Sequence, residues 1–124
     1  MDQLCRVLLA DDVAEIRMLL RLTLELDGRF EVVGEACNGA EAVQLACRQH
    51  PDVVILDLGM PVMDGFTAIP EICRFSPQTK ILVLSAFDPS TSDTVLSLGA
   101  DAYMVKDTAI HEDVVPKLIS LCHN

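Results

Sequence analysis

Acidic, hydroxyl and amino side chains end or directly follow four separate apolar runs of this sequence. They are the pair Asp11-Asp12, then Asp57, Ser85 and Lys106. If three carboxylates met in one site, each like-charge pair would cost roughly 4 kcal/mol at about 4 Å and an effective dielectric constant near 20. A hard divalent cation removes that repulsion, and Mg²⁺ suits a site that offers one or two carboxylates, waters and a phosphate oxygen.

The same residue types could support chemistry at phosphorus. A carboxylate such as Asp57, beside a metal ion and a lysine, can act as a nucleophile, and aspartyl phosphates are a known form of covalent catalysis. Lys106 is a mobile point charge that could pair with Asp57 at rest and with a phosphoryl oxygen afterwards. The Ser85 hydroxyl could hydrogen-bond another phosphoryl oxygen, and the small Ala86 beside it leaves room.

Short apolar segments alternate with helix-length segments along the chain. This pattern predicts strands over Leu4–Leu9, Phe30–Ala36, Asp52–Leu58, Lys80–Ser85 and Asp101–Val105, and helices over Val13–Leu26, Asn38–Gln49, Asp64–Phe75, Pro89–Leu98 and Ile110–Cys122. Five strand–helix units in succession indicate a parallel sheet with right-handed crossovers. We therefore expect a flavodoxin-like (βα)5 α/β fold: an open five-stranded sheet of order 2-1-3-4-5 with helices on both faces. In such sheets, function lies beyond the carboxyl ends of the strands, near the switch point between strands 1 and 3.

Composition limits the classes of function. The 124 residues suffice for one domain, and 51% hydrophobic residues provide a core. The formal charge of -10 argues against direct binding to nucleic acid or to an anionic membrane. No apolar run approaches the roughly 20 residues of a membrane helix, and the chain start lacks the features of a secretion signal. The five cysteines have no C-x-x-C spacing, so we expect reduced, buried thiols in a cytoplasmic protein.

The motifs at the strand ends resemble one family along the whole chain. The matching pieces are Asp11-Asp12, the run from Asp57 to Gly65 (DLGMPVMDG), Ser85-Ala86, and the run from Gly99 to Lys106 (GADAYMVK). Together they resemble the receiver (phosphoacceptor) domain of bacterial two-component response regulators. Lys106 is followed by Asp107, where many receivers have proline, and this resembles the receivers linked to LuxR-type helix-turn-helix output domains. The resemblance implies a single receiver domain over residues 1–124, with no output domain in this chain.

The resemblance also implies roles for individual residues. Asp57 would be the phosphoacceptor. Mg²⁺ would be held by Asp12, by Asp11 directly or through water, by Asp57 and by the backbone carbonyl of Gly59. Ser85, Lys106 and the backbone N–H groups of Gly59 and Ala86 would bind the phosphoryl oxygens. Ser85 and Tyr103 would act as switch residues that change the face formed by the fourth helix, the fifth strand and the fifth helix.

The partners follow from the same resemblance. A sensor histidine kinase or phosphotransfer protein would donate the phosphoryl group from a phosphohistidine, and an output domain or a downstream protein would receive the response. Homodimerisation upon phosphorylation is a further expectation. The domain would be a cytoplasmic switch and no enzyme beyond self-catalysed phosphoryl transfer and autodephosphorylation. The alternative is a degenerate receiver that binds partners without being phosphorylated. A haloacid-dehalogenase-type phosphatase is disfavoured, because Gly59 stands where its general acid would be.

Two prolines fall within predicted helices. A proline inside a helix removes a backbone hydrogen bond and clashes with the carbonyl four residues earlier. We therefore expect a kink or an irregular first turn at Pro70. Pro116 is tolerable if the last helix starts near His111 or Glu112, because the proline then lies early in the helix.

Overall fold

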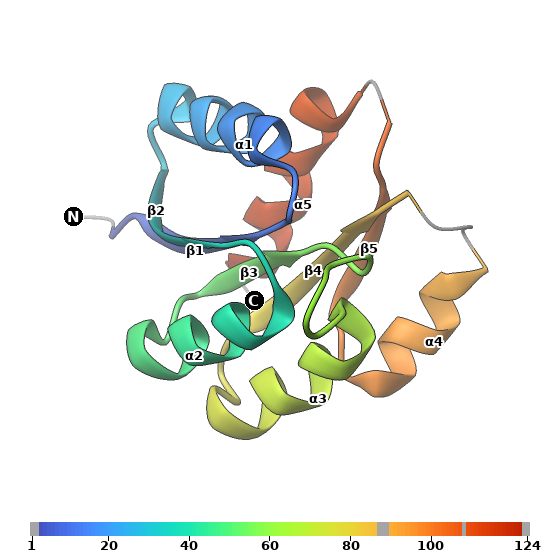
Figure 1. The fold of residues 1–124 in the computed structure, drawn as a ribbon. Helices are drawn as coiled ribbons and strands as arrows, with labels where there is room; N and C mark the ends of the chain where they lie inside the picture. Colours follow the sequence, from blue (N-terminus) through green and yellow to red (C-terminus); the bar gives the residue numbers. More distant parts are fainter. Residues whose placement is uncertain (1–2, 87–89, 108, 123–124) are drawn as a thin grey trace.

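Strands and helices alternate along the whole chain (Figure 1). The computed structural model describes residues 3–86, 90–107 and 109–122. The strands are β1 (Cys5–Ala10), β2 (Phe30–Ala36), β3 (Val53–Leu56), β4 (Lys80–Ser85) and β5 (Ala102–Val105). The helices are α1 (Ala14–Asp27), α2 (Gly39–Gln49), α3 (Gly65–Phe75), α4 (Thr91–Leu98) and α5 (Ile110–Cys122). The predicted elements are confirmed to within a few residues at their ends; the predicted helix start at Pro89 lies outside the described residues.

The five strands form one parallel sheet in the order β2-β1-β3-β4-β5, as predicted. The order places β1 and β3 side by side, with Ala10 paired to Leu56 at their carboxyl ends. The next residue, Asp57, continues this pairing, because its N–H donates to the carbonyl oxygen of Ala10 at 2.9 Å. On the other side of the sheet, Ser85 pairs with Val105. The carboxyl ends of β1, β3, β4 and β5 therefore lie along one edge of the sheet, and so do the residues that follow them.

Helices cover both faces of the sheet (Figure 1). Alternate strand residues point to opposite faces, so each central strand contributes to two cores. On one face, Leu8, Val54 and Leu56 pack with buried residues of α2, α3 and α4. On the other face, Leu9 and Ile55 pack with buried residues of α1 and α5. All four residues of β3 are buried, which is typical of a central strand in a parallel sheet.

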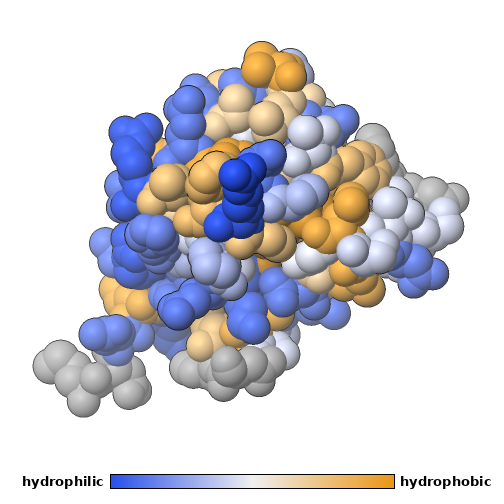
Figure 2. All heavy atoms as spheres, turned by 90° about the horizontal axis from the view of Figure 1, so that it is seen from below, coloured by the Kyte–Doolittle hydropathy of each residue, from blue (hydrophilic) through white to orange (hydrophobic). Residues whose placement is uncertain are grey.

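The outer surface of the α2–α3–α4 layer mixes hydrophilic and hydrophobic side chains (Figure 2). Single large hydrophobic residues such as Phe75 and Leu96 are partly exposed there, and scattered exposure of this kind is ordinary for a globular surface. Among the described residues, no helix is long and apolar enough to cross a membrane.

The two prolines both lie inside continuous helices. α3 is one continuous α-helix from Gly65 to Phe75, and its first turn is regular: Asp64 caps it by accepting a hydrogen bond from the N–H of Thr67 at 2.8 Å. Of the two outcomes expected from Pro70, the irregular first turn is therefore absent, and the kink stays a prediction. α5 begins at Ile110, one residue before the expected start near His111 or Glu112, so Pro116 lies in the second turn of the helix. Pro70 and Pro116 are both exposed, so each ring sits on the solvent side of its helix.

The cysteines differ from the expectation of reduced, buried thiols. Cys5, at the start of β1, and Cys122, at the end of α5, form a disulfide with Cα atoms 6.4 Å apart. Cys37 and Cys47 are exposed, and Cys73 is half-buried. The bonded pair is 117 residues apart in the sequence. It meets only because β1 and α5 both pack in the core that α1 covers, and no local spacing reveals that contact.

Reduction of the Cys5–Cys122 disulfide should lower the midpoint of thermal unfolding. A bond that closes so long a loop restricts the unfolded chain, which stabilises the fold by up to about 5 kcal/mol in the chain-entropy description. The measurement is thermal unfolding with and without a thiol reductant. Cys122→Ser should unfold at the midpoint of the reduced wild type and should not respond to reductant, whereas Cys73→Ser should still respond. Equal midpoints for the oxidised and reduced wild type would contradict the prediction.

Candidate functional site

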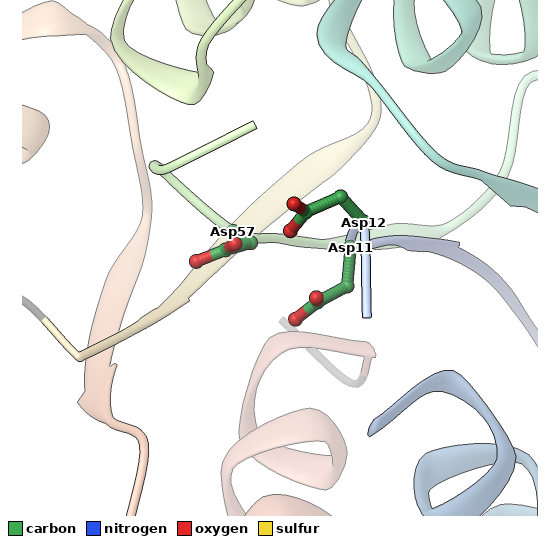
Figure 3. A group of neighbouring side chains, drawn as sticks. All are labelled: Asp11, Asp12 and Asp57. Atoms are coloured by element: carbon green, nitrogen blue, oxygen red, sulfur yellow. The ribbon is translucent and has the colours of Figure 1, made fainter. Parts of the chain in front are cut away.

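Three carboxylates gather at the carboxyl ends of β1 and β3 (Figure 3). Asp11, Asp12 and Asp57 each offer an oxygen atom, and these oxygens all lie within 4.8 Å of one another. Asp11 and Asp57 are 3% and 7% exposed, whereas Asp12 is open to solvent. The backbone holds this arrangement, since Asp57 is bonded to the end of β1 and the N–H of Asp11 donates to Ala36 of β2 at 3.0 Å. The acids predicted from the sequence therefore do meet in one site.

Lys106 supplies a positive charge to two of these carboxylates. Its Nζ lies 2.6 Å from Asp11 Oδ2 and 3.5 Å from Asp57 Oδ1. The sequence predicted a pair between Lys106 and Asp57, and that pair is present, but the shorter contact is to Asp11. The lysine backbone is fixed at the end of β5, because its N–H donates to the carbonyl oxygen of Ser85 at 2.8 Å. Its long side chain then reaches across the end of the sheet to the acids.

The surroundings of Asp57 raise the pKa of its carboxyl above the ordinary value of 3.8. Burial is the largest cause, because it disfavours the charged form, and the negative charge of Asp11 adds to it. Lys106 and the backbone N–H groups of Gly59 and Leu58 oppose the shift by stabilising the carboxylate. The net direction of the pKa shift is upward, so Lys106 and the two N–H groups do not offset the burial of Asp57 and the charge of Asp11. A cation with oxygen ligands would complete the neutralisation.

The other residues predicted for the site lie around this cluster. Ser85 is fully buried at the carboxyl end of β4, and Ala86 follows it at the surface. The exposed Gly59 follows Asp57 by two residues, and its N–H hydrogen-bonds the Asp57 carboxylate. Tyr103 lies on β5 and is half-buried. Its hydroxyl is 3.4 Å from the hydroxyl of Thr91 at the start of α4. The roles of these residues, and of the Gly59 carbonyl as a metal ligand, stay predictions.

Close backbone packing positions the segment between β3 and α3. The N–H of Gly65 donates to the carbonyl oxygen of Leu58 at 2.9 Å. A side chain at Gly65 would place its Cβ 2.4 Å from the backbone oxygen of Asp57. Gly39, at the start of α2, approaches the same segment, and its N–H donates to Met63 at 2.8 Å. These two glycines hold the chain that follows the central acid, and the sequence alone did not single them out for that task.

Sequence reasoning also missed an arginine beside the acidic pair. Arg17, in α1, donates from Nη1 to the backbone carbonyl oxygen of Asp11 and from Nε to Glu35 on β2 at 3.0 Å. The available signal was weak: a basic residue in the first turn of α1, in a segment interpreted only through its apolar positions. Neither aspartate caps α1 in the usual way, because Val13 occupies the cap position without a side-chain hydrogen bond.

Replacing Gly65 with alanine should destabilise the domain by about 1–3 kcal/mol, because the new Cβ would meet backbone atoms that cannot give way. Urea unfolding measures the effect. Gly34→Ala is the matched control, since the nearest atoms to its Cβ would be the flexible ends of two leucine side chains, Leu8 at 3.3 Å and Leu45 at 3.6 Å. If Gly65→Ala proved as stable as Gly34→Ala, close packing against β3 would not be what positions this segment.

Replacing Asp57 with asparagine should stabilise the domain at neutral pH in a metal-free buffer, by on the order of 1 kcal/mol. A carboxyl whose pKa is raised in the folded state binds protons more tightly when folded. The free energy of unfolding of the wild type therefore falls as the pH rises from about 3.8 through the folded pKa. Asp57→Asn should lack that fall.

Urea unfolding at several pH values, with a chelator present, checks this prediction. Asp93→Asn is the control, because Asp93 is an exposed residue in the first turn of α4, away from the acidic cluster. It should change the free energy of unfolding by no more than about 0.5 kcal/mol. A less stable Asp57→Asn at neutral pH would show that Lys106 outweighs the repulsion between the acids.

Comparison with known proteins matches this geometry to one family. Residues 7–115 match the family model described as the response regulator receiver domain. The chain is 43% identical over 108 residues to the transcriptional regulatory protein LiaR of Bacillus subtilis, covering 86% of this chain and 51% of LiaR. It is 40% identical over 109 residues to a protein-glutamate methylesterase/protein-glutamine glutaminase of Methanosarcina acetivorans, covering 86% of this chain but 31% of that protein. The chain thus spans about half, or less, of these curated relatives.

A solved structure agrees with these relatives. The signal receiver domain of the putative response regulator NarL from Mycobacterium tuberculosis superposes with a TM-score of 0.92 at 31% identity, covering 99% of each chain. The family match therefore agrees with the strand order. It also agrees with the order in which the acidic, hydroxyl and lysine positions follow one another along the chain. This chain belongs to the receiver domain family of two-component response regulators.

Proposed function

We propose that residues 1–124 form a single receiver domain that is phosphorylated on Asp57 in a Mg²⁺-dependent reaction and works as a signalling switch. The donor is a phosphohistidine of a sensor histidine kinase or phosphotransfer protein. The observation that carries the proposal is the cluster of Asp11, Asp12 and Asp57 around Lys106. The repulsion within this cluster serves no structural purpose, but it suits a site that takes up a cation.

The donor atoms fit Mg²⁺. Carboxylate oxygens are hard ligands, and a magnesium site commonly uses one or two carboxylates and completes its shell with waters and a phosphate oxygen. Asp12, open to solvent, and the buried Asp11 and Asp57 would hold the ion together with the backbone carbonyl of Gly59. When bound, the ion offsets negative charge on the acids and on the incoming phosphoryl group.

The transfer itself uses groups of this chain. An oxygen of the Asp57 carboxylate attacks phosphorus, an O–P bond forms, and the N–P bond of the phosphohistidine breaks with its electron pair returning to the imidazole. Lys106 lies 3.5 Å from Asp57 Oδ1 and moves to a phosphoryl oxygen as charge arrives there. The Ser85 hydroxyl and the backbone N–H groups of Gly59 and Ala86 bind the remaining phosphoryl oxygens. Hydrolysis of the acyl phosphate returns the carboxylate.

Phosphorylation adds a charge of about -1.5 to -2 next to the end of β4. Ser85 and Tyr103 respond to it as switch residues, and the face formed by α4, β5 and α5 changes its preferred conformation. The contact between the Tyr103 and Thr91 hydroxyls, at 3.4 Å, already joins β5 to α4 across that face. An output domain or a downstream protein reads the change, with homodimerisation as one form of response. The phosphoryl group biases this equilibrium only through its different interactions with the two conformations.

The domain works as a phosphoacceptor and not as a metabolic enzyme. Its relatives include methylesterases, but this chain covers less than a third of the Methanosarcina acetivorans protein, and the receiver family accounts for residues 7–115. A degenerate receiver that never accepts a phosphoryl group is the weaker reading. It would have no use for two buried acids, an exposed acid and a lysine gathered at one sheet edge.

Incubation with a small acyl phosphate and Mg²⁺, followed by intact-protein mass measurement, tests the proposal. The expected result is a gain of one phosphoryl group that disappears with a chelator or in Asp57→Asn. Asp93→Asn, which changes an exposed aspartate outside the cluster, should still be phosphorylated. A gain that survives Asp57→Asn would assign a different acceptor, and no gain even with a phosphohistidine donor would favour the degenerate receiver.

A further inference from the structure

Arg17 connects the acidic loop to the neighbouring strand. Its guanidinium donates to the backbone carbonyl oxygen of Asp11 and, on another edge, to Glu35 Oε1 at 3.0 Å. The Arg17 side chain is 19% exposed, so the contact is partly shielded from solvent. The planar fork of an arginine can hold two acceptors in fixed directions, which a lysine cannot do.

Two hydrogen bonds, one from Arg17 and one to the Asp11 side chain, hold the peptide units that flank Asp12. The peptide before Asp12 is held through the carbonyl of Asp11, which accepts from Arg17. The peptide after it is held through the N–H of Val13, which donates to Asp11 Oδ1 at 2.8 Å. The Asp12 side chain itself is exposed. Its direction toward the other two acids therefore depends on the orientation of its backbone.

Glu35 keeps Arg17 in this position. Oε1 of Glu35 accepts from Arg17, and Oε2 accepts from Nε of Arg21 at 2.8 Å. Both arginines hold the pKa of the Glu35 carboxyl below its ordinary value against the opposing effect of burial, so this residue is ionised at neutral pH. The pairing directs the Arg17 guanidinium to the Asp11 carbonyl and away from the carboxylates, where Lys106 already lies. Partly exposed ion pairs add little to stability, so the network has more bearing on geometry.

We propose that Arg17, oriented by Glu35, is a positioning residue that sets the affinity of the acidic cluster for its divalent cation by fixing the peptide that precedes Asp12. The proposal rests on the proposed function, because it assumes that the cluster binds a cation. It deepens that function by extending the site to α1 and β2. Residues that orient metal ligands commonly change metal affinity by 10–100-fold when they are replaced.

The sign of the effect separates positioning from simple charge. Arg17→Ala and Arg21→Ala each remove one positive charge near an acidic site, and charge alone would make both variants bind cations more tightly. Positioning predicts the opposite for Arg17 and nothing for Arg21, because Arg21 shares Glu35 but does not contact Asp11. Arg21→Ala is therefore the matched control.

Direct titration with Mn²⁺, following the free ion by electron paramagnetic resonance, makes the measurement without any phosphoryl transfer. Arg17→Ala should bind Mn²⁺ about 10-fold more weakly than the wild type. Arg21→Ala should bind within twofold of the wild type or more tightly. Arg17→Lys keeps the charge but loses the fork, so it should recover only part of the affinity. Glu35→Gln should also weaken binding, by severalfold, while the Asp11, Asp12 and Asp57 carboxylates are all unchanged.

Thermal unfolding of each variant guards against loss of the fold, and Arg17→Lys, for which charge alone predicts unchanged affinity, carries the test if Arg17→Ala does not fold. Arg17→Ala binding Mn²⁺ as tightly as Arg21→Ala would overturn the inference. So would full recovery by Arg17→Lys, since charge alone would then suffice. A wild type that binds no Mn²⁺ would instead overturn the proposed function.

Discussion

Repulsion between like charges at one edge of a parallel sheet is the constraint on which this structure depends. β1 and β3 are neighbours, so the residues that follow them, Asp11 and Asp57, meet whether or not their charges favour it. Both are buried, and burial strengthens their interaction. The surrounding groups reduce the repulsion between these two carboxylates. Lys106 reaches both carboxylates, backbone N–H groups approach Asp57, and the remaining acid, Asp12, faces solvent.

Much of the fold and of the site could be predicted from the sequence because the two depend on the same periodicity. Continuous apolar runs such as β3 indicate strands covered on both faces, and five strand–helix units leave few possible topologies. In a parallel sheet, all strands end at one edge, so positions as distant as Asp11, Asp57 and Lys106 can be placed together without a three-dimensional model. The structure confirms both the predicted strand order and the prediction that these side chains lie together.

The features that sequence reasoning missed depend on exact distances between elements. That Lys106 lies nearer to Asp11 than to Asp57 is a difference of less than one ångström, which no spacing rule contains. The contacts of Gly65 and Arg17 join a residue of a helix to backbone atoms that lie just after a strand. Pro70 and Pro116 both lie on the solvent side of their helices, so neither ring interrupts the packing of a core. In each case the deciding quantity is where an element docks, and that is set by the whole core.

The bond between Cys5 and Cys122 also changes how the domain carries mechanical load. It joins the first strand to the last helix, at residues that lie next to the two ends of the described chain. Tension applied to the chain outside this pair passes through the sulfur atoms and bypasses everything between them. The hydrogen bonds of the sheet and the packing of α5 then carry no force, so the acidic edge keeps its shape while the chain around the domain is pulled.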